Sequence, residues 1–187
     1  MNTPNKLTVL RIILVPIFIA FLFLDSIWMN FAWALAVFVI ASITDALDGH
    51  IARKNNLVTT FGKFLDPIAD KILVVSALIS FVELDLCSAI AVIIIISREF
   101  IVTSVRLAAA DSGKVIAAAF SGKLKTAFTM VAICAVLVMQ IFVSASVMDA
   151  SLAKIAGEIL IWIATALTVF SGIEYIVKNR ECINTTK

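Results

Sequence analysis

The sequence has few of the residues on which disulfide frameworks and histidine-based metal centres depend. Its 187 residues include only three cysteines and one histidine. Cys87, Cys134 and Cys182 are far apart and form no CxxC pair, so we interpret them as apolar filler or incidental surface thiols. The single histidine, His50, cannot by itself build a histidine-ligated metal site, and we interpret it as a local polar residue.

Charge is also scarce, because charged residues make up 15% of the chain and the formal net charge is +2. No compact run of basic residues is present, which disfavours a nucleic-acid partner. The absence of internal repeats and low-complexity linkers predicts a single domain over residues 1–187. Hydrophobic residues make up 62% of the chain, against about 45–50% in soluble domains, and the mean hydropathy is +1.10. This composition predicts an integral membrane protein.

Six segments are long and apolar enough to cross a bilayer, for which about 20 mostly apolar residues are needed. They are Leu7–Leu24, Trp28–Asp48, Gly62–Val82, Leu86–Ala108, Gly122–Val143 and Leu152–Val177. The first resembles a signal peptide, but no small-x-small cleavage site follows it, so we expect a retained helix. The sequence therefore predicts an all-α, polytopic membrane protein with six transmembrane helices.

The basic residues lie almost entirely at one set of segment ends. Fourteen of the fifteen lysines and arginines fall there, and Lys154 is the exception. Because basic residues are enriched in cytoplasmic loops, this asymmetry predicts that both termini are cytoplasmic. The polar stretch between the second and third segments falls on the same side, where we expect a polar cavity that faces the cytoplasm.

Four aspartates interrupt this apolar chain within 26 residues: Asp45, Asp48, Asp66 and Asp70. A charge at mid-bilayer depth costs about 2.5–3.5 kcal/mol, so four could cost roughly 10 kcal/mol. Asp45 and Asp48 are separated by about 60° and 4.5 Å on a helix, and Asp66 and Asp70 by about 40° and 6 Å. Each pair therefore shares one helix face. A solvated charged loop would not explain this paired helical spacing.

Four carboxylates so close together repel one another and stay ionised readily only if cations lie among them. A ligand set made only of carboxylates favours a hard ion, Mg²⁺ or Mn²⁺, over Zn²⁺. Four carboxylates suffice for two ions about 4 Å apart, an arrangement suited to phosphoryl chemistry. Two of only six glycines, Gly49 and Gly62, flank the aspartates, where the lack of a side chain would let a phosphate approach the backbone.

The residues DALDGHIAR, then eight residues, then GKFLDPIAD read D-x-x-D-G-x-x-A-R-x8-G-x3-D-x3-D. This pattern resembles the signature of the CDP-alcohol phosphotransferase family, whose members transfer a substituted phosphate from a CDP-linked donor to an alcohol and release CMP. The resemblance implies that Asp45 and Asp66 contact both metal ions and that Asp48 and Asp70 complete one each. It also implies that Asp70 is the general base, a role open to a carboxylate at the edge of a metal site.

The resemblance further implies a nucleotide pocket and an assembly state. Donor-binding residues would be Thr8, Arg11, Gly49, Ala52, Arg53 and Thr59. Arg53 would bind phosphate through two hydrogen bonds. CDP-diacylglycerol is the expected donor, with its acyl tails in the bilayer of a bacterial plasma membrane. Family members are commonly homodimers, and we expect the same here.

A second set of cations lies on the fourth and fifth segments, at Arg98, Arg106, Lys123 and Lys125. An arginine as deep in its segment as Arg98 should face an aqueous cavity or a partner rather than lipid. Lys123 and Lys125 alone could be ordinary cytoplasmic anchors, but together with the two arginines they suggest a site for an anionic acceptor. An acceptor with its own phosphate is favoured over choline, ethanolamine or neutral inositol.

The segments MNTPNKLTVLRI, SREF and SGKLKTA are similar to the bacterial branch of the family that makes phosphatidylglycerophosphate from glycerol 3-phosphate. Glycerol 3-phosphate is therefore the expected acceptor. Phosphatidylglycerol, inositol phosphate and serine remain alternatives within the family. A cation transporter would place its charges near the midplane, often in repeated halves, and an inactive homologue would be expected to have lost an aspartate; neither pattern is found here.

Overall fold

The computed structural model describes residues 3–24, 26–55, 60–111 and 120–179; within these, side chains are described for 9–24, 26–44, 71–107, 109 and 120–179. The described residues form six α-helices and no strand, which confirms the all-α prediction. The helices are α1 (Thr3–Phe23), α2 (Asn30–Asn55), α3 (Thr60–Glu83), α4 (Ala89–Asp111), α5 (Phe120–Ser144) and α6 (Ala150–Lys178). Each predicted segment corresponds to one helix.

The largest difference from the predicted boundaries is at the end of α2, which continues past Asp48 to Asn55. The prediction ended the segment where apolar residues end, whereas a helix can continue into water because its backbone hydrogen bonds are internal. Asp45 and Asp48 therefore lie within α2 rather than at its end.

Two helices in the described part of the chain are long and apolar enough to cross a membrane. These are α5, with a mean hydropathy of 2.3 in its most apolar window, and α6, with 1.8. Among the described side chains of α1 and α2, the apolar segments are Val9–Phe23 and Asn30–Thr44. Large apolar side chains also cover the outside of the bundle, among them Ile90, Val131 and Phe170, each more than 60% exposed. An apolar exterior of this extent is typical of contact with lipid.

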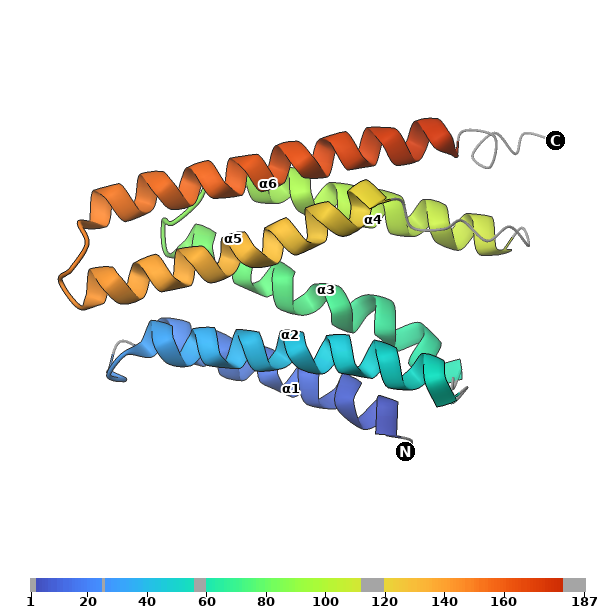
Figure 1. The fold of residues 1–187 in the computed structure, drawn as a ribbon, viewed down its shortest axis with the longest axis horizontal. Coiled ribbons are helices and arrows are strands. Elements are labelled where there is room, and N and C mark those ends of the chain that lie inside the picture. Colours follow the sequence, from blue (N-terminus) through green and yellow to red (C-terminus); the bar gives the residue numbers. More distant parts are fainter. Residues whose placement is uncertain (1–2, 25, 56–59, 112–119, 180–187) are drawn as a thin grey trace.

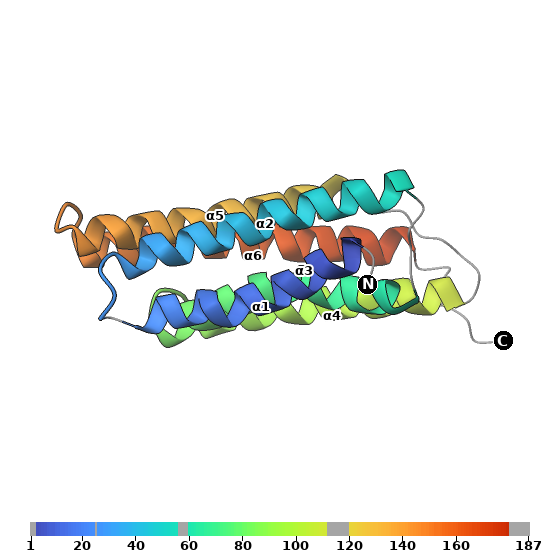
Figure 2. The ribbon, with the colours of Figure 1, turned by 90° about the horizontal axis from the view of Figure 1, so that it is seen from below.

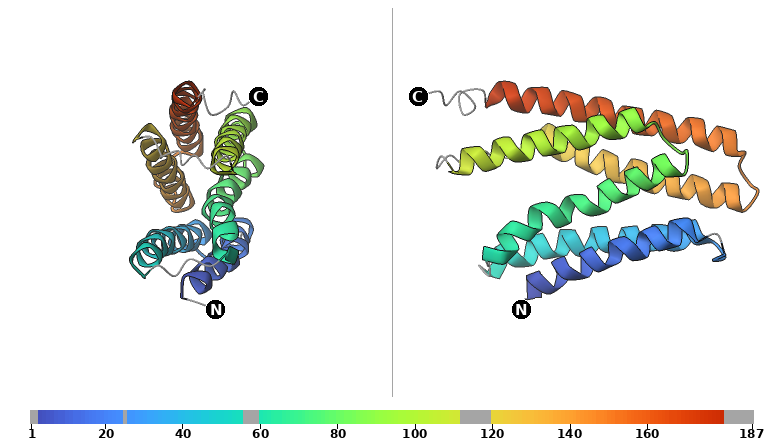
Figure 3. Two further views of the ribbon diagram at one scale, coloured as in Figure 1. Left: turned by 90° about the vertical axis from the view of Figure 1, so that its right-hand side faces the viewer. Right: turned by 180° about the vertical axis from the view of Figure 1, so that it is seen from behind.

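The six helices run alternately in opposite directions, so that both ends of the described chain lie at the same end of the bundle (Figure 1). Neighbouring helices form a closed ring in the order α1, α2, α5, α6, α4, α3. Figure 2 shows the long axes roughly parallel, and the end-on view in Figure 3 shows the ring. Helix α3 crosses the bundle obliquely, from beside α1 and α2 toward α4 (Figure 1).

Short turns join α1 to α2, α3 to α4 and α5 to α6 at the end of the bundle opposite the termini (Figure 1). Each contains a non-glycine residue with positive φ: Met29 at 55°, Asp85 at 55° and Ser146 at 58°. After Asp85, the amide of Leu86 donates to the carbonyl of Phe81 at 2.8 Å, a bond that satisfies a helix-end carbonyl. The residue with positive φ thus lies where the chain leaves one helix and reverses its direction into the next.

The apolar core lies in the half of the bundle nearest these turns. Its largest fully buried side chains include Phe18, Phe38, Phe81, Leu78, Ile133 and Ile161. The rings of Phe18 and Phe38 pack with centroids 5.8 Å apart. Toward the opposite end, buried polar side chains such as Arg11, Lys125, Thr168 and Ser171 lie among the apolar ones, and this half contains the candidate active site.

Candidate active site

The acidic motif lies on two consecutive helices of opposite direction. Asp45 and Asp48 are on α2, and Asp66 and Asp70 are on α3, so each pair occupies one continuous helix. Their side chains lie outside the described ones, and the predicted metal ligation stays a prediction. Among the side chains that are described, no group of three or more His, Cys, Asp or Glu could hold a metal ion.

Most of the predicted donor-binding residues also lie outside the described side chains. Thr8 is on α1, Gly49, Ala52 and Arg53 are on α2, and Thr59 falls in a segment that is not described. Arg11 is the exception: it is on α1 and only 4% exposed. A buried guanidinium requires compensating polar neighbours, and α1 packs against both helices that carry the aspartates.

The four predicted acceptor-binding cations line one pocket of about 470 Å³. Arg98 and Arg106 come from α4, and Lys123 and Lys125 from α5. Lys71 of α3 joins them, and Glu99 is the one carboxylate among the described lining residues. Five cations against one carboxylate give a formal charge of +4, which makes the pocket suited to an anion.

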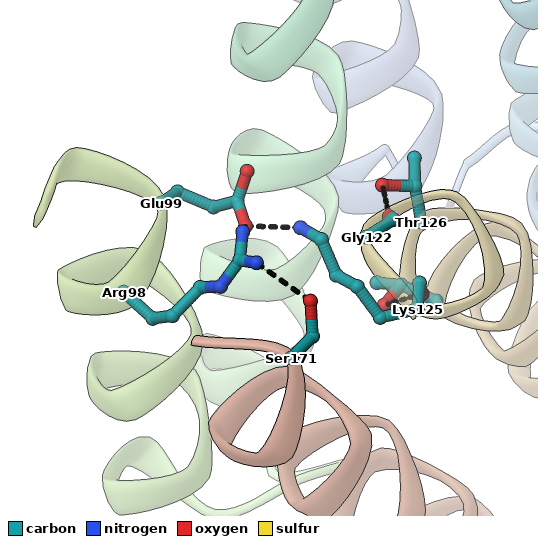
Figure 4. A network of polar contacts seen from close by, with 7 residues as sticks. Arg98, Glu99, Gly122, Lys125, Thr126 and Ser171 are labelled. Carbon is teal, nitrogen blue, oxygen red and sulfur yellow. Dashed lines mark hydrogen bonds and ion pairs between the residues drawn. The ribbon is translucent and has the colours of Figure 1, made fainter. Parts of the chain in front are cut away.

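Glu99 organises two of these cations (Figure 4). Arg98 donates from Nη1 to Glu99 Oε1 at 3.0 Å, and Lys125 donates to the same oxygen. All three side chains are largely buried, with exposed fractions of 12% for Arg98, 9% for Lys125 and 19% for Glu99. One carboxylate shared by two cations lowers the cost of burying them, and among the described side chains of this cluster one positive charge is in excess.

Helix α6 closes the pocket on the side of Arg98 and Arg106. Arg98 donates from Nη2 to the Oγ of Ser171 at 2.8 Å (Figure 4). The guanidinium carbon of Arg106 lies 5.9 Å from the centre of the Tyr175 ring, within the range of a cation–π contact. Ser171 and Tyr175 are 1% and 3% exposed, so these polar side chains face the interior.

Lys71 connects the pocket to the acidic motif, because it is the residue after Asp70 on α3. Adjacent residues on a helix are only about 1.5 Å apart along its axis, so the pocket and Asp70 lie at nearly the same level. The structure thus gathers all four predicted cations into one pocket, and the helix that carries Asp70 forms part of its wall.

Sequence reasoning missed Lys71, Ser171 and Tyr175 as residues of this site. The α6 residues do leave a periodic signal. Small or polar residues recur at helical spacing in an otherwise apolar segment, at Thr165, Thr168, Ser171, Gly172 and Tyr175, and all five are buried. Such a stripe indicates a helix face turned toward a polar interior.

Comparison with known proteins gives a consistent result. Residues 1–170 match the family model described as CDP-alcohol phosphatidyltransferase. A CDP-diacylglycerol–glycerol-3-phosphate 3-phosphatidyltransferase of Bacillus subtilis is 45% identical, covering 99% of this chain and 98% of its own. Proteins of the same name from Rickettsia typhi and Escherichia coli K12 are 38% and 36% identical, and each alignment covers at least 93% of both chains.

Proposed function

Since the chain belongs to the CDP-alcohol phosphatidyltransferase family, we propose that it transfers the phosphatidyl group of CDP-diacylglycerol to glycerol 3-phosphate. The products are phosphatidylglycerophosphate and CMP. The observation that carries the choice of acceptor is the cationic pocket beside the Asp70 level, which has a volume of about 470 Å³ and a formal charge of +4 summed over its described lining residues. Three relatives at 36–45% identity have names that specify the same donor and acceptor.

The pocket discriminates among acceptors by charge. A phosphate monoester would gain charge-assisted hydrogen bonds from lysines and arginines, of which Arg98 and Arg106 can each present a fork of donors. Choline and ethanolamine are cationic and would be repelled. Serine has no net charge to match the excess of lysine and arginine, so we expect it to bind poorly.

The residues of the acidic motif fit divalent ions, because the donor set consists of carboxylates in two helical pairs on consecutive helices that contact each other. We assign Asp45, Asp48, Asp66 and Asp70 as ligands of two Mg²⁺ or Mn²⁺ ions. When bound, the ions would supply positive charge to neutralise the pyrophosphate and the departing CMP.

The protein's own residues would orient the two substrates. Arg53, with Gly49 and Ala52 beside it on α2, would hold the nucleotide diphosphate, with Thr8, Arg11 and Thr59 on the same side. The basic pocket would hold the phosphate of glycerol 3-phosphate, and its free primary hydroxyl would reach Asp70. Asp70 would accept the hydroxyl proton as the oxygen attacks the phosphorus on the lipid side of the donor, and the bond from that phosphorus to CMP would break.

We also propose that residues 1–187 form one catalytic domain with six membrane-crossing helices, cytoplasmic termini and a cytoplasmic active site, in a homodimer in the bacterial plasma membrane. The bias of basic residues toward the termini supports this orientation. Lys154, at the other end of the bundle, forms an ion pair with Asp85 in the α3–α4 turn. The charge of Lys154 is therefore paired with a carboxylate at the end of the bundle where few other cations lie.

The proposed reaction is tested with the purified protein in vesicles that contain CDP-diacylglycerol and Mg²⁺. CMP release should depend on glycerol 3-phosphate and should be negligible with serine, inositol phosphate or phosphatidylglycerol as the only acceptor. Release with serine and none with glycerol 3-phosphate would show that the acceptor is wrong. Release with no acceptor at all would point to hydrolysis of the donor.

A further inference from the structure

Arg98 is held in place by contacts from two helices, and several of these contacts come from α6. Its side chain extends from α4 across Gly172. A Cβ atom placed on Gly172 would lie 2.9 Å from Cγ of Arg98, 3.4 Å from Nε and 3.8 Å from Cδ. The first of these separations is shorter than side chains tolerate, so any larger residue at 172 would push the stem of Arg98 away.

Position 172 faces one side chain, that of Arg98. The three nearest heavy atoms that a Cβ on Gly172 would meet all belong to this one side chain. Gly157, on the same helix, differs: a Cβ there would meet Val136 at 3.3 Å, the backbone oxygen of Leu86 at 3.7 Å and Met139 at 3.8 Å. Gly157 therefore serves general helix packing, whereas Gly172 makes room for one functional side chain.

Ser171, the preceding residue, fixes the far end of the same arginine. Its Oγ accepts from Nη2 at 2.8 Å, while Glu99 accepts from Nη1 at 3.0 Å (Figure 4). Two acceptors from two helices define the plane of the guanidinium. The stem rests on Gly172 and the head is held between Ser171 and Glu99, so few other rotamers remain open to the side chain.

We propose that Ser171 and Gly172 are positioning residues that orient Arg98 for the phosphate of the acceptor. The proposal rests on the proposed function and deepens it. An arginine has several rotatable bonds, and fixing them before the ligand arrives removes an entropic cost from binding.

The test uses purified protein in vesicles. CMP release is measured first at varied glycerol 3-phosphate with saturating CDP-diacylglycerol, and then at varied CDP-diacylglycerol with saturating glycerol 3-phosphate. Gly172→Ala should raise KM for glycerol 3-phosphate about tenfold, with KM for CDP-diacylglycerol unchanged, because the substitution displaces a charged hydrogen-bonding group. Ser171→Ala should raise the same KM about threefold, since it removes one of the two fixing bonds.

Gly157→Ala is the matched control, because it adds the same methyl group to the same helix, away from the pocket. It should leave both KM values unchanged, even if it lowers thermal stability as much as Gly172→Ala does. A double-mutant cycle adds a second reading: in an Arg98→Ala background, Gly172→Ala should have no further effect on KM for glycerol 3-phosphate.

The outcomes separate the two proposals. If the wild-type protein does not use glycerol 3-phosphate, the proposed function is wrong. If it does, but Gly172→Ala changes both KM values alike, matches Gly157→Ala or acts equally without Arg98, the positioning role is wrong. A selective rise in the acceptor KM that disappears in the Arg98→Ala background supports it.

Discussion

The acidic and basic halves of the candidate active site are built in different ways. The four aspartates fall within 26 residues on two consecutive helices. The basic pocket draws on α3, α4, α5 and α6, from Lys71 to Tyr175. Under the proposed function, the acidic half would concentrate metal binding in four carboxylates, whereas the basic half would spread attraction for an anion over five cations. Loss of one aspartate should therefore cost far more than loss of one cation.

The largest effect is expected for Asp70→Asn, which keeps the shape of the side chain but removes its capacity to accept a proton. We expect kcat for CMP release to fall about 10²- to 10⁴-fold, the usual contribution of a general base. The measurement is single-turnover and steady-state CMP release with glycerol 3-phosphate. Asp149→Asn is the matched control at the opposite end of the bundle and should leave kcat unchanged; near wild-type kcat in Asp70→Asn would refute the base assignment.

A smaller effect is expected for Lys125→Ala in the basic half. KM for glycerol 3-phosphate should rise about tenfold and KM for CDP-diacylglycerol should stay the same, because one of five cations is lost while Arg98 still pairs with Glu99. Lys154→Ala removes the same charge from an exposed ion pair at the other end and should change neither constant. Equal changes in both constants for Lys125→Ala would contradict a dedicated acceptor pocket.

Outside the active site, carboxylates should affect stability alone, and Asp149 offers a test. It caps α6 by accepting from the backbone amides of Ser151 and Leu152 at 2.9 and 3.3 Å. Hydrogen bonds from the Ser151 hydroxyl and from these amides lower the pKa of Asp149 below its usual 3.8. Asp149→Ala should lower Tm by about 2–4 °C at pH 7 without changing KM.

The pH dependence of this cap has a definite sign. Because its pKa is lower in the folded protein, Asp149 stabilises the fold at pH values above 3.8, and the contribution is lost as the pH falls through the lowered pKa. The Tm difference between wild type and Asp149→Ala should therefore shrink as the pH is lowered from 5 toward about 2, as followed by thermal unfolding. A difference that grows on acidification would refute the capping role.

The smallest effect on function is expected at Cys87, in the turn between α3 and α4. Burial, with a further contribution from the charge of Glu158, raises the pKa of the Cys87 thiol to about 11. Since only the thiolate reacts, maleimide labelling at pH 8 should be about a hundredfold slower than in the unfolded chain, as measured by peptide mass spectrometry. Cys87→Ser should leave kcat unchanged, and rapid labelling of the folded protein would contradict the buried placement.

Prediction from sequence worked best where the signal is local. The six apolar segments each correspond to one helix, and each aspartate pair lies on a single helix, because helical periodicity depends only on residues three or four apart. Boundaries were less accurate: α2 runs to Asn55, since loss of apolar character does not end a helix. The four cations predicted to bind the acceptor line one pocket, and they could be singled out because an arginine or lysine inside an apolar segment is costly and so conspicuous; their binding role stays a prediction.

Contacts between distant residues could not be predicted in this way. Ser171 and Arg98 are 73 residues apart, and their hydrogen bond exists because α4 and α6 are neighbours in the ring. The sequence does not mark Lys71 as a pocket residue, because it is simply the residue after Asp70. It lines the basic pocket because α3 crosses the bundle obliquely. Nothing in the sequence around Gly172 indicates that the stem of Arg98 occupies the space that a side chain at position 172 would need.

The amino-acid sequence by itself determined the helical architecture and the pairing of the aspartates along α2 and α3, because both follow from composition and from the 3.6-residue period of the helix. Only the tertiary structure decided which cations share Glu99, that α6 forms the far wall of the pocket, and how Arg98 is oriented. These features depend on the packing of helices that are distant in the chain, and close packing gives each side chain only the space that its neighbours leave.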